Sequence, residues 1–453
     1  MGHNGVSDTG DIITGTNGEQ DVALRDNWGH LGLLYKWWCP TSEDQLRDAE
    51  TKILSYLKTP SETYHVDIGP IMVGGETSNH RIWTLSAKES FPERIPLVLL
   101  HGLGAAVGLW ALNLDQLAKD RHVHAIDLMG FGRSSRPQFS QDAVLAEEEL
   151  VTSLEEWRKE MKLEKIILLG HSMGAFIATC YALKYPERVA SLILADPWGV
   201  TEPPADIYAR FALPYLVKVI DYIMTYFYPF FGLRMIGRLG PKITGIVKWR
   251  LVKNFKSLGG QEAAYAIQEY IYHANAAPPS GEAAFYWMKG SLAFAKNPLI
   301  RRFAFLHPDI ALCLIYGGRS WLRQCSKEVL TQICPDSDIE VEIIPHATHQ
   351  VPTDAIDEFN QIVLRACTNA DNKRRTVKGL NKFCCASLQN HILARVLNNM
   401  GEKDVIRRNR DGDDENDEMD PQICTNKVLL IIAALLVVFA VWMGLKMKET
   451  DRF

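Results

Sequence analysis

The sequence predicts an α/β protein in which a mostly parallel central sheet is covered by helices on both faces. Three stretches of the chain carry this prediction. Residues 166–169 are an apolar run that ends in Gly-His-Ser-Met-Gly, and a helix-forming run follows at once at 175–184. Residues 96–100 predict a second buried strand, which enters a glycine-rich loop, and 340–344 predict a last strand, which enters a loop with histidines. Strands alternating with helical segments are typical of a parallel sheet.

The loop after residues 96–100 has the sequence His-Gly-Leu-Gly, and Gly102 and Gly104 let its backbone approach a ligand closely. Where a nucleophilic serine follows a later strand, the oxyanion hole takes one amide from this loop and one from the residue after the serine. We therefore expect the amides of Leu103 and Met173 to hold an oxyanion.

Ser172 lies in a Gly-x-Ser-x-Gly sequence between a predicted strand and a predicted helix. This context distinguishes a nucleophile elbow from a chance match. The serine must occupy a strained turn with its hydroxyl exposed, and side chains at Gly170 or Gly174 would clash there. We predict that Ser172 is the nucleophile; the alternative is a serine at an ordinary strand-to-helix turn.

The acid of the expected catalytic triad is missing from its usual place. That place follows the strand before the histidine, here 310–316, but the loop 317–327 contains no carboxylate and has Arg323 near the expected position. An arginine there would oppose a protonated histidine. Asp196, directly after the predicted strand 191–195, could reach the same histidine and is our candidate acid. That Asp196 and the following proline simply begin a turn is the alternative.

A general base is expected after the last strand, within Pro-His-Ala-Thr-His at 345–349. We choose His349, and His346 is the competing candidate. Residues 201–300 form an insertion between the two halves of the sheet, which predicts a helical cap. Its aromatic runs at 211–216 and 222–231 would line an acyl-chain pocket or pack between helices.

Several motifs together resemble one branch of the α/β-hydrolase-domain family. Besides the loop at 101–104 and the elbow, the motifs are Trp-Cys-Pro-Thr-Ser at 38–42, Asp-Leu-Met-Gly-Phe-Gly-Arg-Ser-Ser at 127–135, Asp-Pro-Trp-Gly at 196–199, Tyr-Ile-Tyr-His-Ala-Asn at 270–275 and His-Pro-Asp-Ile at 307–310. The branch includes the lipid-droplet lipolysis co-activator, the N-acyl-phosphatidylethanolamine lysohydrolase, cardiolipin deacylases and lysophosphatidate acyltransferases. The resemblance spans roughly residues 28–368 and implies an α/β-hydrolase fold with a cap.

The resemblance implies two different functions. Co-activator members lack the serine nucleophile, whereas this chain keeps Ser172; hydrolytic members keep the late-strand acid, whereas this chain has Arg323. The branch is also credited with an H-x-x-x-x-D acyltransferase motif, which His349 and Asp354 match. A carboxylate at the start of the next helix is the structural alternative for Asp354.

Composition agrees with an enzyme that carries additional segments. The net charge of −5 over 453 residues gives no argument for nucleic-acid binding. The nine cysteines have no framework spacing, which indicates a reducing compartment, and we expect no metal or other cofactor. The expected divisions are a disordered N-terminus (1–27), a Trp-rich lipid-contact segment with a first helix (28–60), the hydrolase core (61–200 and 301–370), the cap (201–300), a basic then acidic linker (371–426) and a transmembrane span (428–445).

The span at 428–445 is uncharged and mostly apolar, which predicts a transmembrane tail anchor, with a buried helix as the alternative. The enzyme domain would then face the cytosol from the mitochondrial outer membrane or the endoplasmic reticulum, or contact lipid droplets. The Trp-rich run at 28–38 favours a membrane interface or packs on the core. The basic part of the linker favours anionic lipids, and Cys384 and Cys385 could be palmitoylated.

These observations predict a membrane-associated serine ester hydrolase or O-acyltransferase that acts on glycerophospholipids or lysophospholipids. Its partners would be a membrane or lipid-droplet surface and a phospholipid or acyl-CoA substrate, with no nucleic acid. The alternative is a catalytically impaired lipid-droplet scaffold that co-activates a triacylglycerol lipase.

Overall fold

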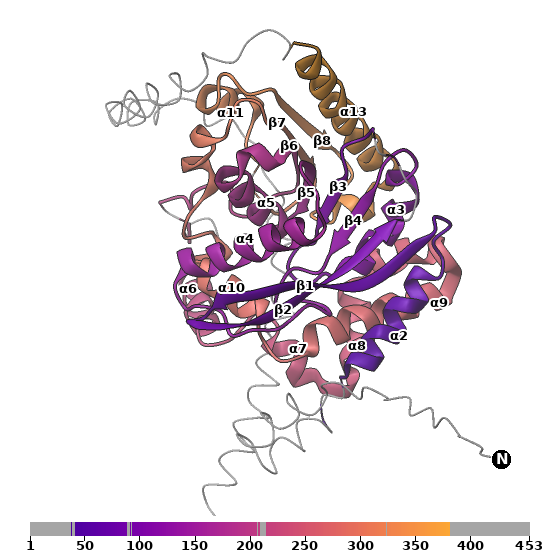
Figure 1. Cartoon of the computed structure of the whole chain (residues 1–453). Coiled ribbons are helices and arrows are strands. Elements are labelled where there is room, and N and C mark those ends of the chain that lie inside the picture. Colours follow the sequence, from indigo (N-terminus) through magenta and orange to yellow (C-terminus); the bar gives the residue numbers. More distant parts are fainter. Residues whose placement is uncertain are drawn as a thin grey trace, which may run out of the picture.

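A computed structural model describes residues 38, 41–87, 91, 93–205, 207, 208, 214–322 and 324–380. Its centre is an eight-stranded sheet with the strand order β1-β2-β4-β3-β5-β6-β7-β8 (Figure 1). The strands are β1 (Ser61–Val73), β2 (Glu76–Ala87), β3 (Leu97–Leu100), β4 (Val123–Ile126), β5 (Ile166–His171), β6 (Val189–Ala195), β7 (Ala311–Gly317) and β8 (Ile339–Ile344).

Most of the sheet is parallel. Strands β4, β3, β5, β6, β7 and β8 pair in parallel, while β1 pairs antiparallel with β2 and β2 antiparallel with β4. The parallel strands are short and apolar because both of their faces are buried. Their carboxyl ends meet at one edge of the sheet, where ligand sites of such folds lie. The α/β fold and the mostly parallel sheet predicted from the sequence are confirmed.

Helices cover both faces of the sheet, and the sheet divides the core in two. On one face, Leu168 of β5 belongs to the same apolar cluster as residues of α4 (Ala143–Glu160) and α5 (Met173–Lys184). On the other face, Leu169 belongs to the cluster of α3 (Ala111–Leu117) and α13 (Ile356–Leu380). Successive strand residues point to opposite faces, so consecutive leucines serve the two halves of the core.

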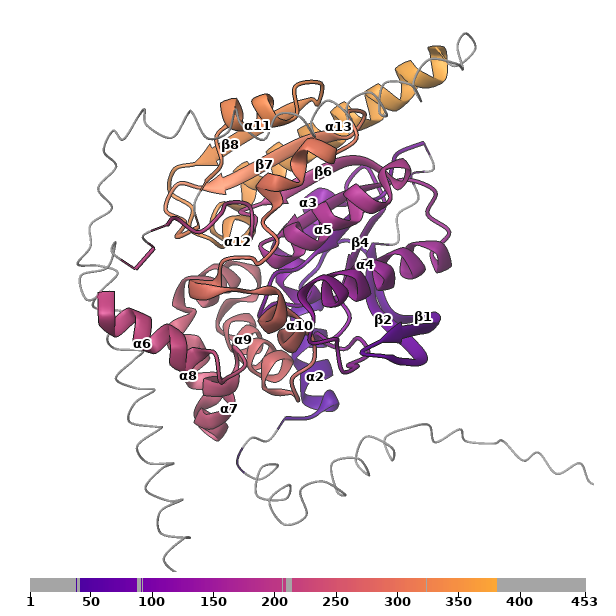
Figure 2. The same cartoon turned by 90° about the vertical axis from the view of Figure 1, so that its left-hand side faces the viewer.

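The insertion between β6 and β7 is helical and forms a cap. Its helices are α6 (Pro214–Met224), α7 (Phe231–Ile236), α8 (Gly240–Val247), α9 (Trp249–Ala276) and α10 (Gly281–Met288). Helix α9 is broken at Gly260, where φ is 67°, and packs on α2 (Glu43–Leu54) around Ile53 and Phe255. Figure 2 shows α6, α7 and α8 along one side of the molecule, opposite β1 and β2.

Two further α-helices and six short 3₁₀ helices complete the described part of the chain. The α-helices are α11 (Lys327–Ile333) and α12 (Val351–Asp354), and the 3₁₀ helices are Val107–Trp110, Pro186–Arg188, Gly237–Leu239, Ser291–Ala293, Leu299–Arg301 and Phe303–Phe305. Helix α13 continues to Leu380, ten residues past the predicted end of the hydrolase core at residue 370.

The predicted tail-anchored localisation needs correction. Among the described residues, no helix is both long and apolar enough to cross a membrane. The three longest of them, α4, α9 and α13, carry several charged residues each and pack on the protein core. This finding contradicts the anchoring that we predicted, and with it the assignment to the mitochondrial outer membrane or endoplasmic reticulum. The span on which the prediction rested, 428–445, lies outside the described residues.

Other predicted segments also lie outside the described residues. They are the N-terminus to residue 37, including most of the Trp-rich run, and the chain from 381 onward, including Cys384, Cys385 and the acidic run 411–420. Arg323 lies outside them too.

Candidate active site

Ser172 occupies a strained turn between β5 and α5. Its φ of 55° and ψ of −117° are rarely adopted by a residue with a side chain. The flanking glycines are sterically required, because a Cβ at Gly170 would lie 2.3 Å from the carbonyl oxygen of Gly174, and a Cβ at Gly174 would lie 2.5 Å from that of His101. The local geometry is that of a nucleophile elbow.

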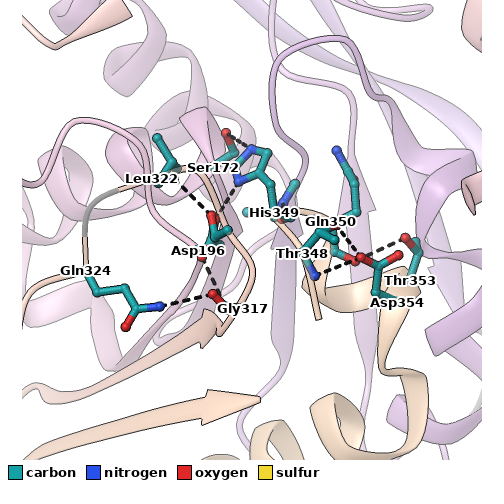
Figure 3. Close-up of polar contacts among 12 residues, drawn as sticks. Ser172, Asp196, Gly317, Leu322, Gln324, Thr348, His349, Gln350, Thr353 and Asp354 are labelled. Carbon is teal, nitrogen blue, oxygen red and sulfur yellow. Dashed lines mark hydrogen bonds and ion pairs between the residues drawn. The ribbon is translucent and has the colours of Figure 1, made fainter. Parts of the chain in front are cut away.

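His349 lies in the loop after β8 and contacts Ser172 directly. Its Nε2 is 3.0 Å from the Ser172 Oγ, and its Nδ1 is 2.6 Å from the Oδ2 of Asp196 (Figure 3). A carboxylate only accepts hydrogen bonds, so Nδ1–H donates to Asp196, and Nε2 keeps a lone pair that accepts from the serine hydroxyl. This tautomer is the one that a general base needs.

Asp196 follows β6 and is fully buried. Its backbone is also strained, with a φ of 41°. Besides His349, it accepts the Gly317 amide at 3.1 Å through Oδ1 and the Ser320 hydroxyl at 2.5 Å through Oδ2. The Ser320 oxygen in turn accepts the Leu322 amide at 3.1 Å. The carboxylate that contacts His349 therefore comes from the end of β6, and the loop after β7 supplies donors to it.

The two other candidates at this end of the chain lie elsewhere. The His346 side chain is 53% exposed and lies 3.7 Å from Glu358. Asp354 accepts the Thr348 amide at 3.0 Å and the Thr348 hydroxyl, and its other oxygen accepts from Asn254 at 3.4 Å. Asp354 thus closes the turn that carries His349, and its hydrogen bonds reach neither His349 nor Ser172.

The His-Gly-Leu-Gly loop lies against the elbow. A Cβ at Gly102 would be 2.9 Å from the Cβ of Ser172, so only glycine allows this approach. Within the described residues, the backbone amides of Leu103 and Met173 donate to no other group. Burial lowers the pKa of His101 to about 4, so the ring is neutral; its Nδ1–H donates to the Gly102 carbonyl, and Nε2 accepts the Leu128 amide.

His171, which precedes the serine, supports the base from behind. Burial, followed by the charge of His349, lowers the pKa of His171 to about 3, which keeps it neutral. Its Nε2–H donates to the backbone carbonyl of His349 at 2.8 Å, and the two ring centroids are 5.0 Å apart. The turn therefore positions both Ser172 and the backbone of His349.

A buried polar network behind the His-Gly-Leu-Gly loop was not predicted from the sequence. Asp127 accepts the Val107 amide at 2.7 Å, and burial, followed by the charge of Glu50, raises its pKa to about 7. The Tyr270 hydroxyl accepts the Gly108 amide at 2.9 Å and donates to Glu50 at 3.2 Å. The network links cap helix α9, through Tyr270, and α2, through Glu50, to the segment after the His-Gly-Leu-Gly loop. Its residues fall partly in motifs that served only to mark the family resemblance.

A narrow cavity lies behind the elbow, lined by His101, Gly102, Ala105, Leu109, Trp110, His171, Gln350, Pro352 and Thr353. The aromatic run of the cap, 222–231, contributes no residue to it. Several side chains of that run, among them Tyr222 and Tyr226, are exposed to solvent instead. Among the described residues, no group of three or more His, Cys, Asp or Glu side chains could hold a metal ion.

Known proteins resemble this chain along most of its length. Residues 95–231 match the family model of the alpha/beta hydrolase fold. The mouse 1-acylglycerol-3-phosphate O-acyltransferase ABHD5 is 39% identical over 78% of this chain and 98% of its own length. The bovine (Lyso)-N-acylphosphatidylethanolamine lipase is 38% identical over 76% of this chain and 97% of its own length. A solved esterase from Thermogutta terrifontis is 19% identical, with a TM-score of 0.46, and covers 68% of this chain and 99% of its own.

Proposed function

The chain belongs to the α/β-hydrolase family of these relatives, and from this premise we propose that it is a serine-dependent enzyme that transfers the acyl group of a lipid ester. The observation that carries the proposal is the continuous hydrogen-bonded chain from the Ser172 Oγ through His349 to Asp196. Membership of this family supports a role in lipid metabolism in general, and the role of each residue is our proposal.

In the proposed reaction, His349 Nε2 takes the hydroxyl proton of Ser172 as the serine oxygen attacks the ester carbonyl. Asp196 stabilises the imidazolium that forms. The amides of Leu103 and Met173 donate to the oxyanion of the tetrahedral intermediate. His349 then gives its proton to the leaving alcohol, and the acyl group remains on Ser172 as an ester.

The acceptor of the acyl group decides between two reactions. Attack by water, deprotonated by His349, releases a fatty acid and regenerates the serine. Attack by the hydroxyl of a lysophospholipid, deprotonated by His349, gives a diacyl phospholipid instead. The acyl donor is then another lipid ester, which releases an alcohol, or acyl-CoA, whose thioester bond breaks to release the CoA thiol. The printed names of the relatives include both an acyltransferase and a lipase, which supports a glycerophospholipid or lysophospholipid substrate for this chain.

A non-catalytic function is the second candidate. It would be a scaffold on lipid droplets that co-activates a triacylglycerol lipase. One observation favours it: the loop 317–327, where the resemblance led us to expect the acid, has no carboxylate. The contact between Asp196 and His349 favours the enzyme, because it supplies a carboxylate to the base from another strand.

A fluorophosphonate probe tests the proposal, since it labels only an activated serine. We expect labelling of the wild type and none of Ser172→Ala. The control variant is Ser191→Ala, which removes another buried hydroxyl, on β6, and should keep the labelling. A folded wild type that stays unlabelled would exclude the enzyme and favour the scaffold. Mass spectrometry of products from a lysophospholipid, with and without acyl-CoA, then separates hydrolysis from acyl transfer.

A further inference from the structure

Helix α6 has its apolar side outward. The side chain that it buries is a carboxylate, Asp221, which accepts the Tyr208 hydroxyl at 2.7 Å and the Leu292 amide at 3.0 Å. Apolar side chains along the same helix, such as Tyr222 and Ile223, are exposed. A surface helix of a globular protein normally shows the reverse arrangement. The exposed face of α6 is therefore suited to contact something other than water.

The junction of α8 and α9 shows the same feature. Ile246, Val247 and Trp249 are 72%, 57% and 52% exposed, and the following Arg250 is exposed as well. Three exposed apolar side chains thus lie next to an exposed cation, whereas burial lowers the pKa of the intervening Lys248. Aromatic and aliphatic side chains beside Lys and Arg are typical of protein segments that lie in a membrane interface.

The charged residues in this part of the cap are all cations. Residues 222–261 contain no Asp or Glu and seven cations, namely Arg234, Arg238, Lys242, Lys248, Arg250, Lys253 and Lys256. Arg234 is buried and paired with Glu282. The exposed Lys242, Lys253 and Lys256 form no ion pair with any described residue. The surface therefore complements a negatively charged partner.

We propose that the cap face, defined as the exposed sides of α6 and of residues 246–256, docks on an anionic lipid surface. Figure 2 shows α6 and α8 on the same side of the molecule, where one flat surface can contact both. The apolar side chains enter the interface, and the cations lie at the level of the lipid phosphates. A lipid bilayer matches both properties at once, because it offers an apolar interior beneath a negative surface.

Other residues of the cap contact the loop that contains Leu103. The Phe230 ring lies 3.1 Å from where a Cβ of Gly104 would stand, and Asn275 donates to the Gly104 carbonyl at 3.1 Å. Docking by the cap would therefore keep the site close to the lipid surface. Only this advantage rests on the proposed function; the docking itself follows from the exposed side chains and their charge.

Cosedimentation of the purified full chain with vesicles tests the proposal. We expect binding to phosphatidylcholine vesicles that contain about 30% phosphatidylserine and weaker binding to phosphatidylcholine alone. The double variant Ile246→Asp/Val247→Asp should lose at least about tenfold in partitioning, because burial of one large aliphatic side chain is worth about that factor. The matched control is Val144→Asp/Leu145→Asp on α4, whose side chains are 58% and 55% exposed and which should bind as the wild type does.

The charge component has its own variants. Lys253→Gln and Lys256→Gln should each weaken binding to the anionic vesicles by about fivefold and leave binding to the neutral vesicles unchanged. Both side chains are exposed, so these variants keep the test valid if the aspartate pair does not fold. Thermal unfolding midpoints report folding, and fluorophosphonate labelling of wild-type Ser172 reports the proposed function separately.

Three results would overturn the docking proposal. The first is a wild type that binds neither kind of vesicle. The second is unchanged vesicle binding by folded cap-face variants, which would assign lipid contact to other segments such as residues 28–37. The third is self-association in analytical ultracentrifugation that the aspartate pair abolishes without any effect on lipid, which would make a second copy of the chain the occupant.

Discussion

Strands β6 and β7 lie side by side in the sheet and end differently at the site. At the end of β6, the fully buried Asp196 adopts a φ of 41° and contacts His349. At the end of β7, no carboxylate is present, and the loop instead directs the Gly317 amide and the Ser320 hydroxyl at the Asp196 carboxylate. One strand end supplies the negative charge, and the other supplies hydrogen-bond donors that hold it.

The difference shows that one strand end can carry a carboxylate while another carries the hydrogen-bond donors that orient it. A carboxylate has about four lone-pair sites, and Asp196 uses its two oxygens for three donors, the imidazole included. Supporting hydrogen bonds of this kind fix the orientation of a functional side chain. The loop after β7 therefore holds the Asp196 carboxylate in place without carrying a carboxylate itself.

The largest effect is expected from Asp196→Asn, which removes the negative charge at the end of β6. The amide can donate to His349 Nδ1, which favours the wrong tautomer of the imidazole and leaves no negative charge for the imidazolium. Loss of this function costs roughly 10³–10⁴-fold in turnover. The measurement is the kcat for a short-chain ester, with the thermal unfolding midpoint as a check on folding.

A matched control for this variant is Asp115→Asn on α3. Asp115 also accepts backbone amides, those of Lys58 and Thr59, but its hydrogen bonds reach neither His349 nor Ser172. Its variant should keep the wild-type kcat. An Asp196→Asn enzyme that turned over at the wild-type rate would show that the base works without this carboxylate.

Sequence patterns were sufficient to propose Ser172 and His349, because each depends on residues near it in the chain. The elbow depends on Gly170 and Gly174, which stand within two residues of Ser172, and the base follows the last strand directly. The acid could not be assigned in the same way, because its role depends on which neighbouring strand reaches His349. That neighbourhood is set by the order of β5, β6 and β7 in the sheet, which no local pattern encodes.

A smaller effect is expected from Ser320→Ala, which would weaken the support from β7. The variant removes one donor to the Asp196 carboxylate and leaves the Leu322 amide without its acceptor. A neutral hydrogen bond is worth about 1 kcal/mol net and one to a charged group up to about 3, so kcat should fall by about tenfold with KM unchanged. Ser320→Thr, which keeps the hydroxyl, should restore most of the rate. Equal kcat values for all three proteins would limit Ser320 to a structural contact.

The cap shows the other limit of the sequence. The aromatic run at 222–231 predicted either pocket lining or packing between helices. In the structure Phe227 and Phe231 do stack, with centroids 4.4 Å apart, but Tyr222 and Tyr226 are exposed. An amphipathic pattern separates the apolar face of a helix from its polar face, but it does not show which of the two is buried. For α6, that choice depends on Asp221 and the distant Leu292 amide.

The smallest effect extends the comparison to the end of β5, where His171 supports the base. Its pKa is about 3 in the folded protein, against an ordinary value of 6.5, so the unfolded chain binds a proton between these values and the folded protein does not. The stability it contributes is present above pH 6.5 and is lost as the pH falls, by about 1.4 kcal/mol per pH unit. His171→Gln should therefore flatten the fall in the free energy of unfolding between pH 6.5 and 5, measured by urea denaturation.

His124→Gln on β4 is the control: burial lowers the pKa of His124 to about 4 as well, but its hydrogen bond goes to Ser86. Both variants should flatten the slope, whereas only His171→Gln should also lower kcat, by a few fold, because it alone loses the imidazole donor to the His349 carbonyl. A His171→Gln enzyme with the wild-type slope would mean that this ring is not neutral in the folded protein, and the hydrogen bond to His349 would need another explanation.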